Sequence, residues 1–339
     1  MNTTIDTKGL KGRSFLTLMD FTQEEIRTLL DLAKELKARR AAGQAGGLLA
    51  GKNILLIFEK TSSRTRCSFE IGALEEGAQV TYIGPGSSQF GKKESVRDSA
   101  QLFGKYYDAI EYRGFAQKTV EELAKHSGVP VWNGLTDDDH PTQILADLLT
   151  IEEKVRKPLS EVKVVFAGDI RNNMSYAWMY GAAIMGFRFA AYGPEELAPS
   201  ETVVARADAR AAASRSGGVI EWGSDPALLE GADVIYSDIW ASMGEEDKIP
   251  ERVKLLTPYR VTEQMFEKTG NPDAIFLHCL PSFHDFDTEM ARDQFALGYD
   301  IREVTDEVFS GPRSVVFDEA ENRLHTIKSV MVATISDVL

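Results

Sequence analysis

Short apolar runs that alternate with helix-like stretches constrain the fold of this chain more than any other feature. The runs are rich in β-branched and other apolar residues, as buried strands are. They lie at residues 53–58, 80–84, 109–112, 130–133, 162–167, 188–192, 219–222, 233–240, 274–280 and 315–317. Because parallel strands need crossover connections, which are usually helices, this alternation predicts an α/β fold with mostly parallel sheets flanked by helices.

The length of the chain predicts two domains. Its 339 residues exceed the roughly 250–300 residues at which a single core stops growing. A long amphipathic stretch at 141–155 ends near Pro158 and is the best candidate for the connection between the domains. We therefore expect a first domain at 1–150, a second at 151–319, and a helix at about 320–339 that packs back on the first.

Charge and cysteine content argue against several classes of protein. A formal charge of −14 disfavours nucleic-acid backbones as partners, because their binding needs a large basic surface. Cys67 and Cys279 are far apart and belong to no Cys-x-x-Cys or Cys/His cluster, so the sequence suggests neither a disulfide framework nor a metal site. No uncharged apolar run approaches the roughly 18 residues of a membrane span, and the start of the chain is polar. A cytoplasmic location is expected.

The segment 62–66, Ser-Ser-Arg-Thr-Arg, has the composition of an anion site. It stands between the apolar run at 53–58 and a helix-like stretch. The N–H groups at the start of the helix, the hydroxyls and two guanidinium groups would converge there on a phosphate. The alternative is that Ser62 or Ser63 only caps the helix while the arginines form surface ion pairs.

Four further clusters of polar residues follow strand-like runs, at the sheet edge where α/β proteins bind ligands. They are Tyr112-Arg113-Gly114, His140-Pro141-Thr142-Gln143, the segment 238–244 and His278-Cys279-Leu280-Pro281. Each has a plain alternative, since an arginine that leaves a strand is usually solvated and a histidine at a helix start is more often a cap than a catalyst.

Taken in order along the chain, these clusters and the segment 320–326 resemble the motifs of the transcarbamylases, from about Phe15 to Leu339. Within that family the resemblance is strongest to the ornithine carbamoyltransferases. A collinear set of motifs is far more specific than any one of them. The first motif of the family usually has threonine where this chain has Ser63, which keeps the hydroxyl and loses a methyl group.

The resemblance implies that carbamoyl phosphate binds on the first domain. Arg113 would bridge its phosphate and carbamoyl groups, and Arg323 would close the site. Gln89 lies in a loop rich in glycine and serine that resembles the family loop reaching into a neighbouring subunit, so a homo-oligomer is implied, a trimer or a multiple of trimers. By composition alone this loop is a surface loop. The implied binding set is Ser62, Ser63, Arg64, Thr65, Gln89, Arg113, His140, Gln143 and Arg323.

The resemblance places L-ornithine on the second domain. Asp238 would pair with its α-ammonium group, and Cys279 would lie near its δ-amine. Asn173 would hold the amino-acid head, although the Asn172-Asn173 pair can equally be a turn or a helix cap. The implied binding set is Asn173, Asp238, Ser242, Met243, Cys279 and Leu280.

Carbamoyl transfer needs a neutral amine, yet an alkyl ammonium has a pKa near 10.4. A carboxylate beside the reacting nitrogen would stabilise its cation, so Asp238 is better assigned to the α-ammonium. Cys279 is not expected to be a covalent nucleophile, because its neighbour His278 would point to the opposite face of a regular strand. Orientation of the substrates and oxyanion stabilisation would then carry catalysis, without a metal or organic cofactor. The implied catalytic groups are Arg113, His140, Thr65 and, beside the amine, Cys279.

The expected reaction gives L-citrulline and phosphate from carbamoyl phosphate and L-ornithine, in arginine biosynthesis or the arginine deiminase pathway. The Ser-Met-Gly turn within 238–244 favours ornithine over putrescine, which has no amino-acid head. The alternatives are a carbamoyltransferase for putrescine or acetylornithine and a non-catalytic binding paralogue. A nucleoside triphosphatase and a dinucleotide enzyme lack support, since no GxxxxGK[ST] loop occurs and the run at 162–167 does not continue as GxGxxG.

Overall fold

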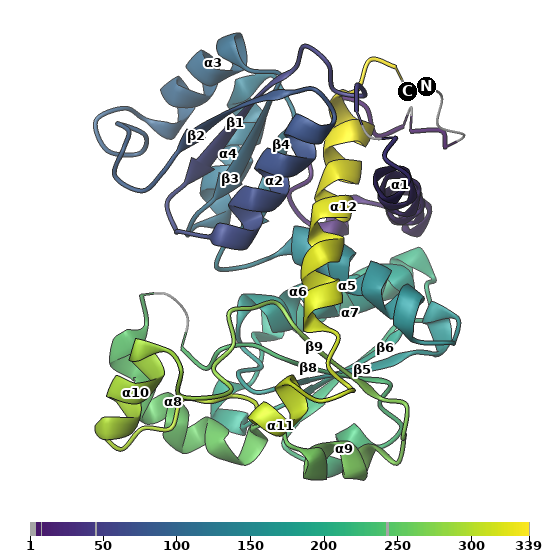
Figure 1. The fold of residues 1–339 in the computed structure, drawn as a ribbon, viewed down its shortest axis with the longest axis vertical. Coiled ribbons are helices and arrows are strands. Elements are labelled where there is room, and N and C mark those ends of the chain that lie inside the picture. The colour runs from purple at the N-terminus through teal and green to yellow at the C-terminus, as the bar shows by residue number, and fades with distance from the viewer. Residues whose placement is uncertain (1–4, 8, 45, 242–243, 339) are drawn as a thin grey trace. The chain divides into compact units, whose positions relative to one another are not determined.

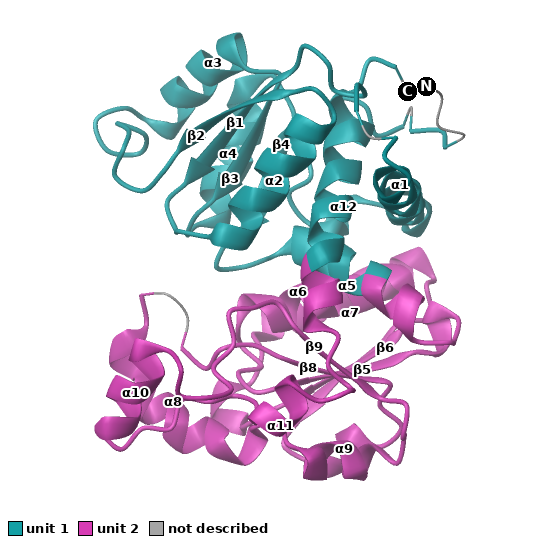
Figure 2. Ribbon diagram, in the orientation of Figure 1, with its two compact units in different colours: residues 1–149, 321–339 teal, residues 150–320 magenta. Residues whose placement is uncertain are grey.

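The computed structural model describes residues 5–7, 9–44, 46–241 and 244–338. They form two compact units, shown in different colours in Figure 2. Unit 1 holds the chain up to Leu149 and again from Glu321, and unit 2 holds Thr150–Ala320. The boundaries fall within helices α5 (Pro141–Lys154) and α12 (Val316–Ile335).

Unit 1 is built on a parallel sheet with strand order β2-β1-β3-β4 (Figure 1). The strands are β1 (Asn53–Phe58), β2 (Gln79–Ile83), β3 (Ala109–Arg113) and β4 (Val131–Leu135). The helices of this unit, besides parts of α5 and α12, are α1 (Gln23–Ala41), α2 (Ser63–Glu75), α3 (Val96–Tyr106) and α4 (Gln117–Ser127). The chain order reverses between β1 and β3, so the crevice beyond the carboxyl ends of these two strands is the place where such a sheet binds ligands.

Helix α12 completes the core of unit 1. Side-chain hydrogen bonds join it to α1, where Lys37 Nζ donates to Asn322 Oδ1 at 2.8 Å, and to β4, where Trp132 Nε1 donates to Thr334 Oγ1 at 3.1 Å. The buried apolar side chains of its last turns, such as Val330, pack in the same core. A helix from the end of the chain therefore lies beside the first sheet.

Unit 2 is built on a second parallel sheet, with strand order β7-β6-β5-β8-β9. Its strands are β5 (Lys163–Ala167), β6 (Arg188–Tyr192), β7 (Val219–Gly223), β8 (Val234–Ser237) and β9 (Ile275–His278). Its helices are α6 (Asn173–Met185), α7 (Glu201–Ser214), α8 (Ile249–Leu256), α9 (Glu263–Thr269), α10 (Glu289–Ala296) and α11 (Asp306–Phe309). Here the order reverses between β5 and β8. The expected α/β class with two parallel sheets is confirmed.

Short 3-10 helices lie between the longer elements. They are η1 (Leu18–Asp20), η2 (Leu159–Glu161), η3 (Glu195–Leu197), η4 (Pro226–Leu229), η5 (Glu246–Lys248) and η6 (Thr257–Tyr259). Within the described part of the chain, no helix combines the length and the apolar character that crossing a membrane requires.

The strand expected at 315–317 is wrong, because helix α12 already begins at Val316. In the described part of the chain, an isolated bridge between Phe276 and Ser314 pairs the segment before α12 with β9. Asp318 and Glu319 follow in the first turn of α12, where acidic side chains interact favourably with the helix dipole. Three apolar residues are too few to outweigh that helix start.

We predict that His325 of α12 makes the fold sensitive to acid. Its side chain is buried, and burial lowers its pKa to about 4, although the nearby Glu321 carboxylate opposes the shift. An unfolded histidine takes up a proton near pH 6.5, so acidification below that value favours the unfolded chain, by about 3 kcal/mol at pH 4. His325→Asn should therefore flatten the fall in the free energy of unfolding between pH 6.5 and pH 4, measured by urea denaturation. His126→Asn on α4, a partly exposed position, is the control. Equal pH slopes for His325→Asn and the unmodified chain would contradict the prediction.

Candidate active site

Two buried arginines of unit 1 converge on one hydroxyl group. Thr65 Oγ1 accepts a hydrogen bond from Arg113 Nη1 at 3.2 Å and another from Arg323 Nη2 at 2.8 Å. Arg113 ends β3 and is 7% exposed, while Arg323 lies on α12 and is 3% exposed. We call Thr65, Arg113, Arg323 and His140 the arginine cluster. Buried guanidinium groups at a strand end form a strong site for a phosphate or carboxylate.

Helix α2 supplies Thr65 because Ser62 starts the helix there. Ser62 is the N-cap residue, and its Oγ accepts the Thr65 N–H at 3.2 Å. Ser63 and Arg64 lie in the first turn, whose N–H groups have no acceptor within a helix. The capping alternative for Ser62 is thus correct. It is compatible with an anion site, since the cap uses one N–H and leaves the helix start aimed at the crevice.

The expectation that both arginines of the segment 62–66 converge on one anion is wrong for Arg66. Its Nε donates to Glu70 Oε1 at 2.8 Å, and its guanidinium group lies 3.7 Å from the ring centroid of Tyr82. Arg64 instead lies close enough to His140 to disfavour the charged form of that imidazole. Residues two apart on a helix point about 200° apart, so only one of the two can face the crevice.

His140 adds a neutral donor to the arginine cluster. It directly precedes α5, is 3% exposed, and has Thr142 Oγ1 at 3.4 Å from its Nδ1. Burial lowers the pKa of His140 well below its usual range, and the positive charges of Arg323, Arg113 and Arg64 lower it further. The imidazole is therefore neutral at pH 7, so it can donate an N–H without adding a full charge.

Gln143 and Gln89, the two glutamines expected at the site, have different surroundings. Gln143 is buried one turn into α5, where its Nε2 donates to Asp147 Oδ1 at 2.7 Å. Gln89 lies between β2 and α3, where its main-chain carbonyl oxygen accepts the backbone N–H groups of Lys92 and Lys93. Its predicted reach into a neighbouring subunit stays a prediction.

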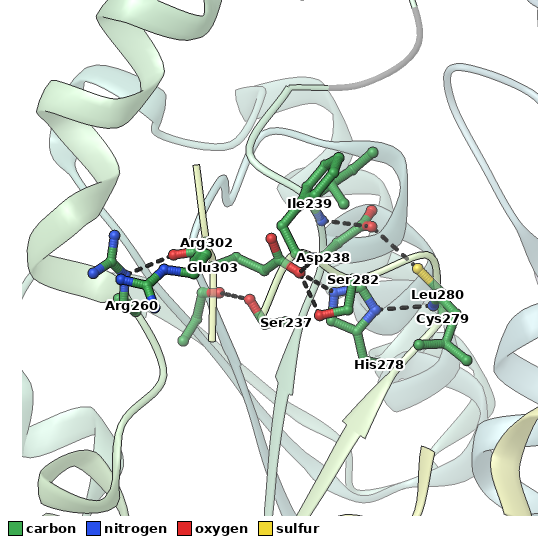
Figure 3. A network of polar contacts seen from close by, with 12 residues as sticks. Ser237, Asp238, Ile239, Arg260, His278, Cys279, Leu280, Ser282, Arg302 and Glu303 are labelled. Carbon is green, nitrogen blue, oxygen red and sulfur yellow. Dashed lines mark hydrogen bonds and ion pairs between the residues drawn. The ribbon is translucent and has the colours of Figure 1, made fainter. Parts of the chain in front are cut away.

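In unit 2, a second polar cluster gathers at the carboxyl ends of β5, β8 and β9 (Figure 3). Asp238 follows β8, and its Oδ1 accepts the Ile239 N–H at 2.8 Å and the Cys279 thiol at 3.1 Å. Its Oδ2 accepts from Asn172 Nδ2 at 3.2 Å. Asn172, the N-cap of α6, therefore contacts Asp238, whereas the expected residue, Asn173, is the first residue of that helix.

The positions of Ser242 and Met243, expected to bind the amino-acid head, lie outside the described residues. The chain resumes after them at Gly244, whose N–H donates to Glu246 Oε1 at 3.1 Å. Their role stays a prediction.

His278 holds the turn that presents Cys279 and Leu280. Its Nδ1 accepts the Leu280 N–H at 2.9 Å, which assigns the ring proton to Nε2. Leu280 has a φ of 55°, a left-handed conformation that is unfavourable for a residue with a branched side chain. The Cys279 thiol meets Asp238, and the ring nitrogens of His278 face Leu280 and Glu303. This agrees with the expectation that His278 is not the base of a cysteine nucleophile.

Two glutamates that sequence reasoning missed anchor this turn. Glu303 Oε1 lies 3.2 Å from His278 Nε2 and accepts hydrogen bonds from Ser282 Oγ at 2.6 Å and the Phe283 N–H at 2.7 Å. Glu319 Oε2 accepts the His278 N–H at 2.8 Å. Both glutamates are fully buried, and no local sequence pattern marks them, since Glu303 stands beside Arg302 and Glu319 beside Asp318.

Among the described residues, two groups of side chains lie close enough together to be considered as metal ligands. Asp238, His278 and Cys279 form one, and His284, Asp285 and Asp306 form the other, each with its possible ligand atoms within 4.8 Å of one another. The sequence spacing did not suggest the first group, since the topology of the sheet brings Asp238 to the other two. In both groups these atoms already hydrogen-bond to neighbours, as His284 Nδ1 does to Asp306 Oδ1 at 2.8 Å.

Models of protein families match both units of the chain. A model for the carbamoyl-P binding domain of aspartate/ornithine carbamoyltransferase matches residues 13–153, and a model for the Asp/Orn binding domain matches residues 160–334. The chain belongs to the aspartate/ornithine carbamoyltransferase family. The family resemblance carried by its motifs is confirmed.

Relatives in the aspartate/ornithine carbamoyltransferase family cover nearly the whole chain. A catabolic ornithine carbamoyltransferase of Clostridium perfringens is 63% identical over 96% of this chain and 98% of its own length. Ornithine carbamoyltransferase 1, catabolic, of Staphylococcus epidermidis is 54% identical over 97% of this chain and 100% of its own. The solved structure of ornithine carbamoyltransferase from Pyrococcus furiosus is 40% identical with a TM-score of 0.86, covering 96% of this chain and 98% of that one.

We predict that Glu303 stabilises the fold of the chain, because its buried carboxylate accepts two hydrogen bonds from the turn after β9. Glu303→Leu would leave the Ser282 hydroxyl and the Phe283 N–H without their acceptor, at a cost of roughly 2–4 kcal/mol in the free energy of unfolding. Glu303→Gln keeps an oxygen acceptor and should cost less. Urea denaturation measures both, with Glu307→Leu at an exposed position of α11 as the control. A loss for Glu303→Leu no larger than that for Glu307→Leu would refute this role.

Proposed function

We propose that this chain transfers the carbamoyl group of carbamoyl phosphate to the δ-amine of L-ornithine, giving L-citrulline and phosphate. One observation carries the proposal: two buried guanidinium groups meet at Thr65, at the start of α2, beside a neutral His140. Such a site suits a dianionic donor with a polar carbonyl end. Relatives that are named ornithine carbamoyltransferase and cover nearly the whole chain support ornithine as the acceptor.

In the proposed complex, the phosphate of the donor binds at the start of α2. Backbone N–H groups and hydroxyls of the first turn would hold its oxygens, and Arg64 and Arg323 would balance its charge. Arg113 would reach both the phosphate and the carbamoyl oxygen. The first-turn residues in this role are Ser62, Ser63, Arg64 and Thr65.

The carbamoyl end of the donor would meet groups that stabilise developing negative charge. Attack by the amine puts that charge on the carbamoyl oxygen, where Arg113, Thr65 and His140 can donate hydrogen bonds. Each such preorganised donor typically contributes roughly 3–4 kcal/mol to the barrier reduction. Gln143 is oriented by Asp147, so its amide carbonyl points away from that carboxylate and can accept from the carbamoyl nitrogen. Phosphate then leaves with its charge held by the arginines, and this chemistry requires no metal or organic cofactor.

The amino acid would bind at the cluster around Asp238. In its free state this carboxylate accepts from Asn172, the Ile239 N–H and the Cys279 thiol, and the α-ammonium of ornithine offers a stronger, charged donor to it. Asn173, Ser242 and Met243 would complete the contacts to the amino-acid head. Cys279 and the Leu280 carbonyl would orient the δ-amine without strongly stabilising its cation. This matters because holding that amine neutral at pH 7 costs about 4–5 kcal/mol.

The same proposal includes a homo-oligomer, a trimer or a multiple of trimers, in which Gln89 reaches a neighbouring site. The family resemblance supports this assembly. The proposal also includes a cytoplasmic location, which the cysteine pattern supports.

We predict that Arg113→Ala lowers turnover at least about a hundredfold, as the loss of an oxyanion donor does in other enzymes. The assay supplies carbamoyl phosphate with ornithine, putrescine, aspartate or acetylornithine and measures the carbamoylated product. Ornithine should be the productive acceptor. Arg66→Ala is the matched control, since Arg66 is paired with Glu70 outside the arginine cluster.

Near-normal turnover in a folded Arg113→Ala variant would remove Arg113 from the mechanism. If the chain carbamoylates putrescine or acetylornithine and not ornithine, the proposed acceptor is wrong. Binding of carbamoyl phosphate without any product would identify a non-catalytic relative.

We predict that kcat/KM for ornithine rises with pH from about pH 6.5, by up to about tenfold per unit, until the amine is deprotonated. His140 does not change charge during this rise. Its pKa lies well below the usual range, so the ring is already neutral at the pH where the rise begins. His140→Asn should therefore reduce the rate and keep the slope. A flat profile for the unmodified chain would show that the amine proton is not limiting, and a slope lost in His140→Asn would assign the titration to the histidine.

A further inference from the structure

Glu111 is a carboxyl group buried in the middle of the first sheet. It lies on β3, two residues before Arg113, and is 0% exposed. Because side chains alternate along a strand, Glu111 and Arg113 point to the same face. Within the part of the chain that the structure describes, neither carboxyl oxygen of Glu111 has a hydrogen-bond partner. Buried polar atoms are rarely left so, which calls for a functional reason.

The carboxyl of Glu111 lies directly beside the arginine cluster. A Cβ added at Gly134 would come within 1.9 Å of Glu111 Oε1 and 3.2 Å of Thr65 Cγ2, so the carboxyl fills the space next to Thr65 that glycine leaves open. The Gly134 carbonyl is also 3.5 Å from Arg113 Nη1. The acid, the threonine and the arginine therefore share one buried volume.

The charged groups that face Glu111 come from two elements. Arg113 of β3 and Arg323 of α12 both favour its ionised form. Gly134 of β4 lies next to its carboxyl, and the methyl group of Thr65 from α2 borders the same space. His140, before α5, is the other titratable group of the cluster. Burial opposes the two arginines and raises the pKa of Glu111 well above its usual range.

A dianion bound to these guanidinium groups would remove the support that they give to the Glu111 carboxylate. The attraction of Arg113 and Arg323 is then offset by the negative charge of the ligand, whereas the cost of burial remains. Loss of the charge on Glu111 and binding of the dianion must favour each other, and by linkage the effect is reciprocal.

We propose that Glu111 is a positioning residue that exchanges its charge with the substrate: in alkaline solution it is an anion beside Arg113 and Arg323 in the empty site, and it takes up a proton from solvent when carbamoyl phosphate binds. The proton returns to solvent when the phosphate product leaves. The identity of the ligand rests on the proposed function, while the exchange itself requires only a dianion at the arginine cluster.

The exchange has a measurable sign. Above the pKa of Glu111 in the empty site, the affinity for carbamoyl phosphate should fall by up to about tenfold per pH unit, because each binding event requires a proton. Glu111→Gln has nearly the same shape and imitates the protonated form. It should bind carbamoyl phosphate more tightly than the unmodified chain at pH 9 and lack the slope.

The test compares the unmodified chain, Glu111→Gln and a control, Glu70→Gln. Glu70 is a carboxylate of α2 that pairs with Arg66 away from the arginine cluster. The dissociation constant of carbamoyl phosphate is measured from pH 6.5 to pH 9.5, and proton uptake on binding is measured by calorimetry at pH 8 in buffers of different ionisation enthalpy. The unmodified chain and Glu70→Gln should take up to one proton per site, and Glu111→Gln should take almost none. A merely structural role would change stability without changing this uptake.

Two results would overturn the inference. Proton uptake in Glu111→Gln equal to that of the unmodified chain would assign the titration to another group, with His140 the first candidate. Absence of uptake by the unmodified chain throughout the pH range would show that Glu111 keeps one charge state. If Glu111→Gln does not fold, Glu111→Met, of similar length and without charge, provides the same comparison.

The same measurements made with inorganic phosphate separate this inference from the proposed function. Citrulline formation with unchanged proton uptake in Glu111→Gln would overturn the role of Glu111 alone. Proton uptake that depends on Glu111 when phosphate binds, in a chain that forms no citrulline, would overturn the proposed reaction alone.

Discussion

The unit 1 site depends on one oxygen atom, Thr65 Oγ1, which accepts hydrogen bonds from two buried guanidinium groups. Two cations held this close in a buried site repel each other and need both an acceptor and a nearby negative charge. Thr65 supplies the acceptor, and the neighbouring carboxyl of Glu111 supplies the charge once it is ionised, which both arginines favour and burial opposes. The donors are therefore aimed before any ligand binds, which is what electrostatic preorganisation requires.

Parallel strand order explains why polar groups from distant parts of the chain meet at the ends of both sheets. Where the order reverses, at β1 and β3 in unit 1 and at β5 and β8 in unit 2, the connections leave on opposite sides and the strand ends stay uncovered. Arg113 and Asp238 stand at these two places. The hydrophobic pattern that builds the sheets thus also determines where chemistry is possible.

The fold and the motif positions were predictable because they depend on local patterns: apolar runs, a helix cap at Ser62 and polar residues after strands. Long-range contacts were not predictable. Glu303 and Glu319 act on the His278 turn from later in the chain, and only the folded sheet brings Asn172 to Asp238. The orientation of Arg66 was predictable from helix geometry, since residues 64 and 66 cannot face the same side.

Helix α12 gives the donor site a property that concerns how the protein is made. Arg323 is separated from Thr65 by 258 positions in the chain, yet it provides one of the two guanidinium groups at that hydroxyl. The ribosome must translate past residue 323 before both guanidinium groups can meet at Thr65, and a product of earlier termination would retain the first sheet without its second cation.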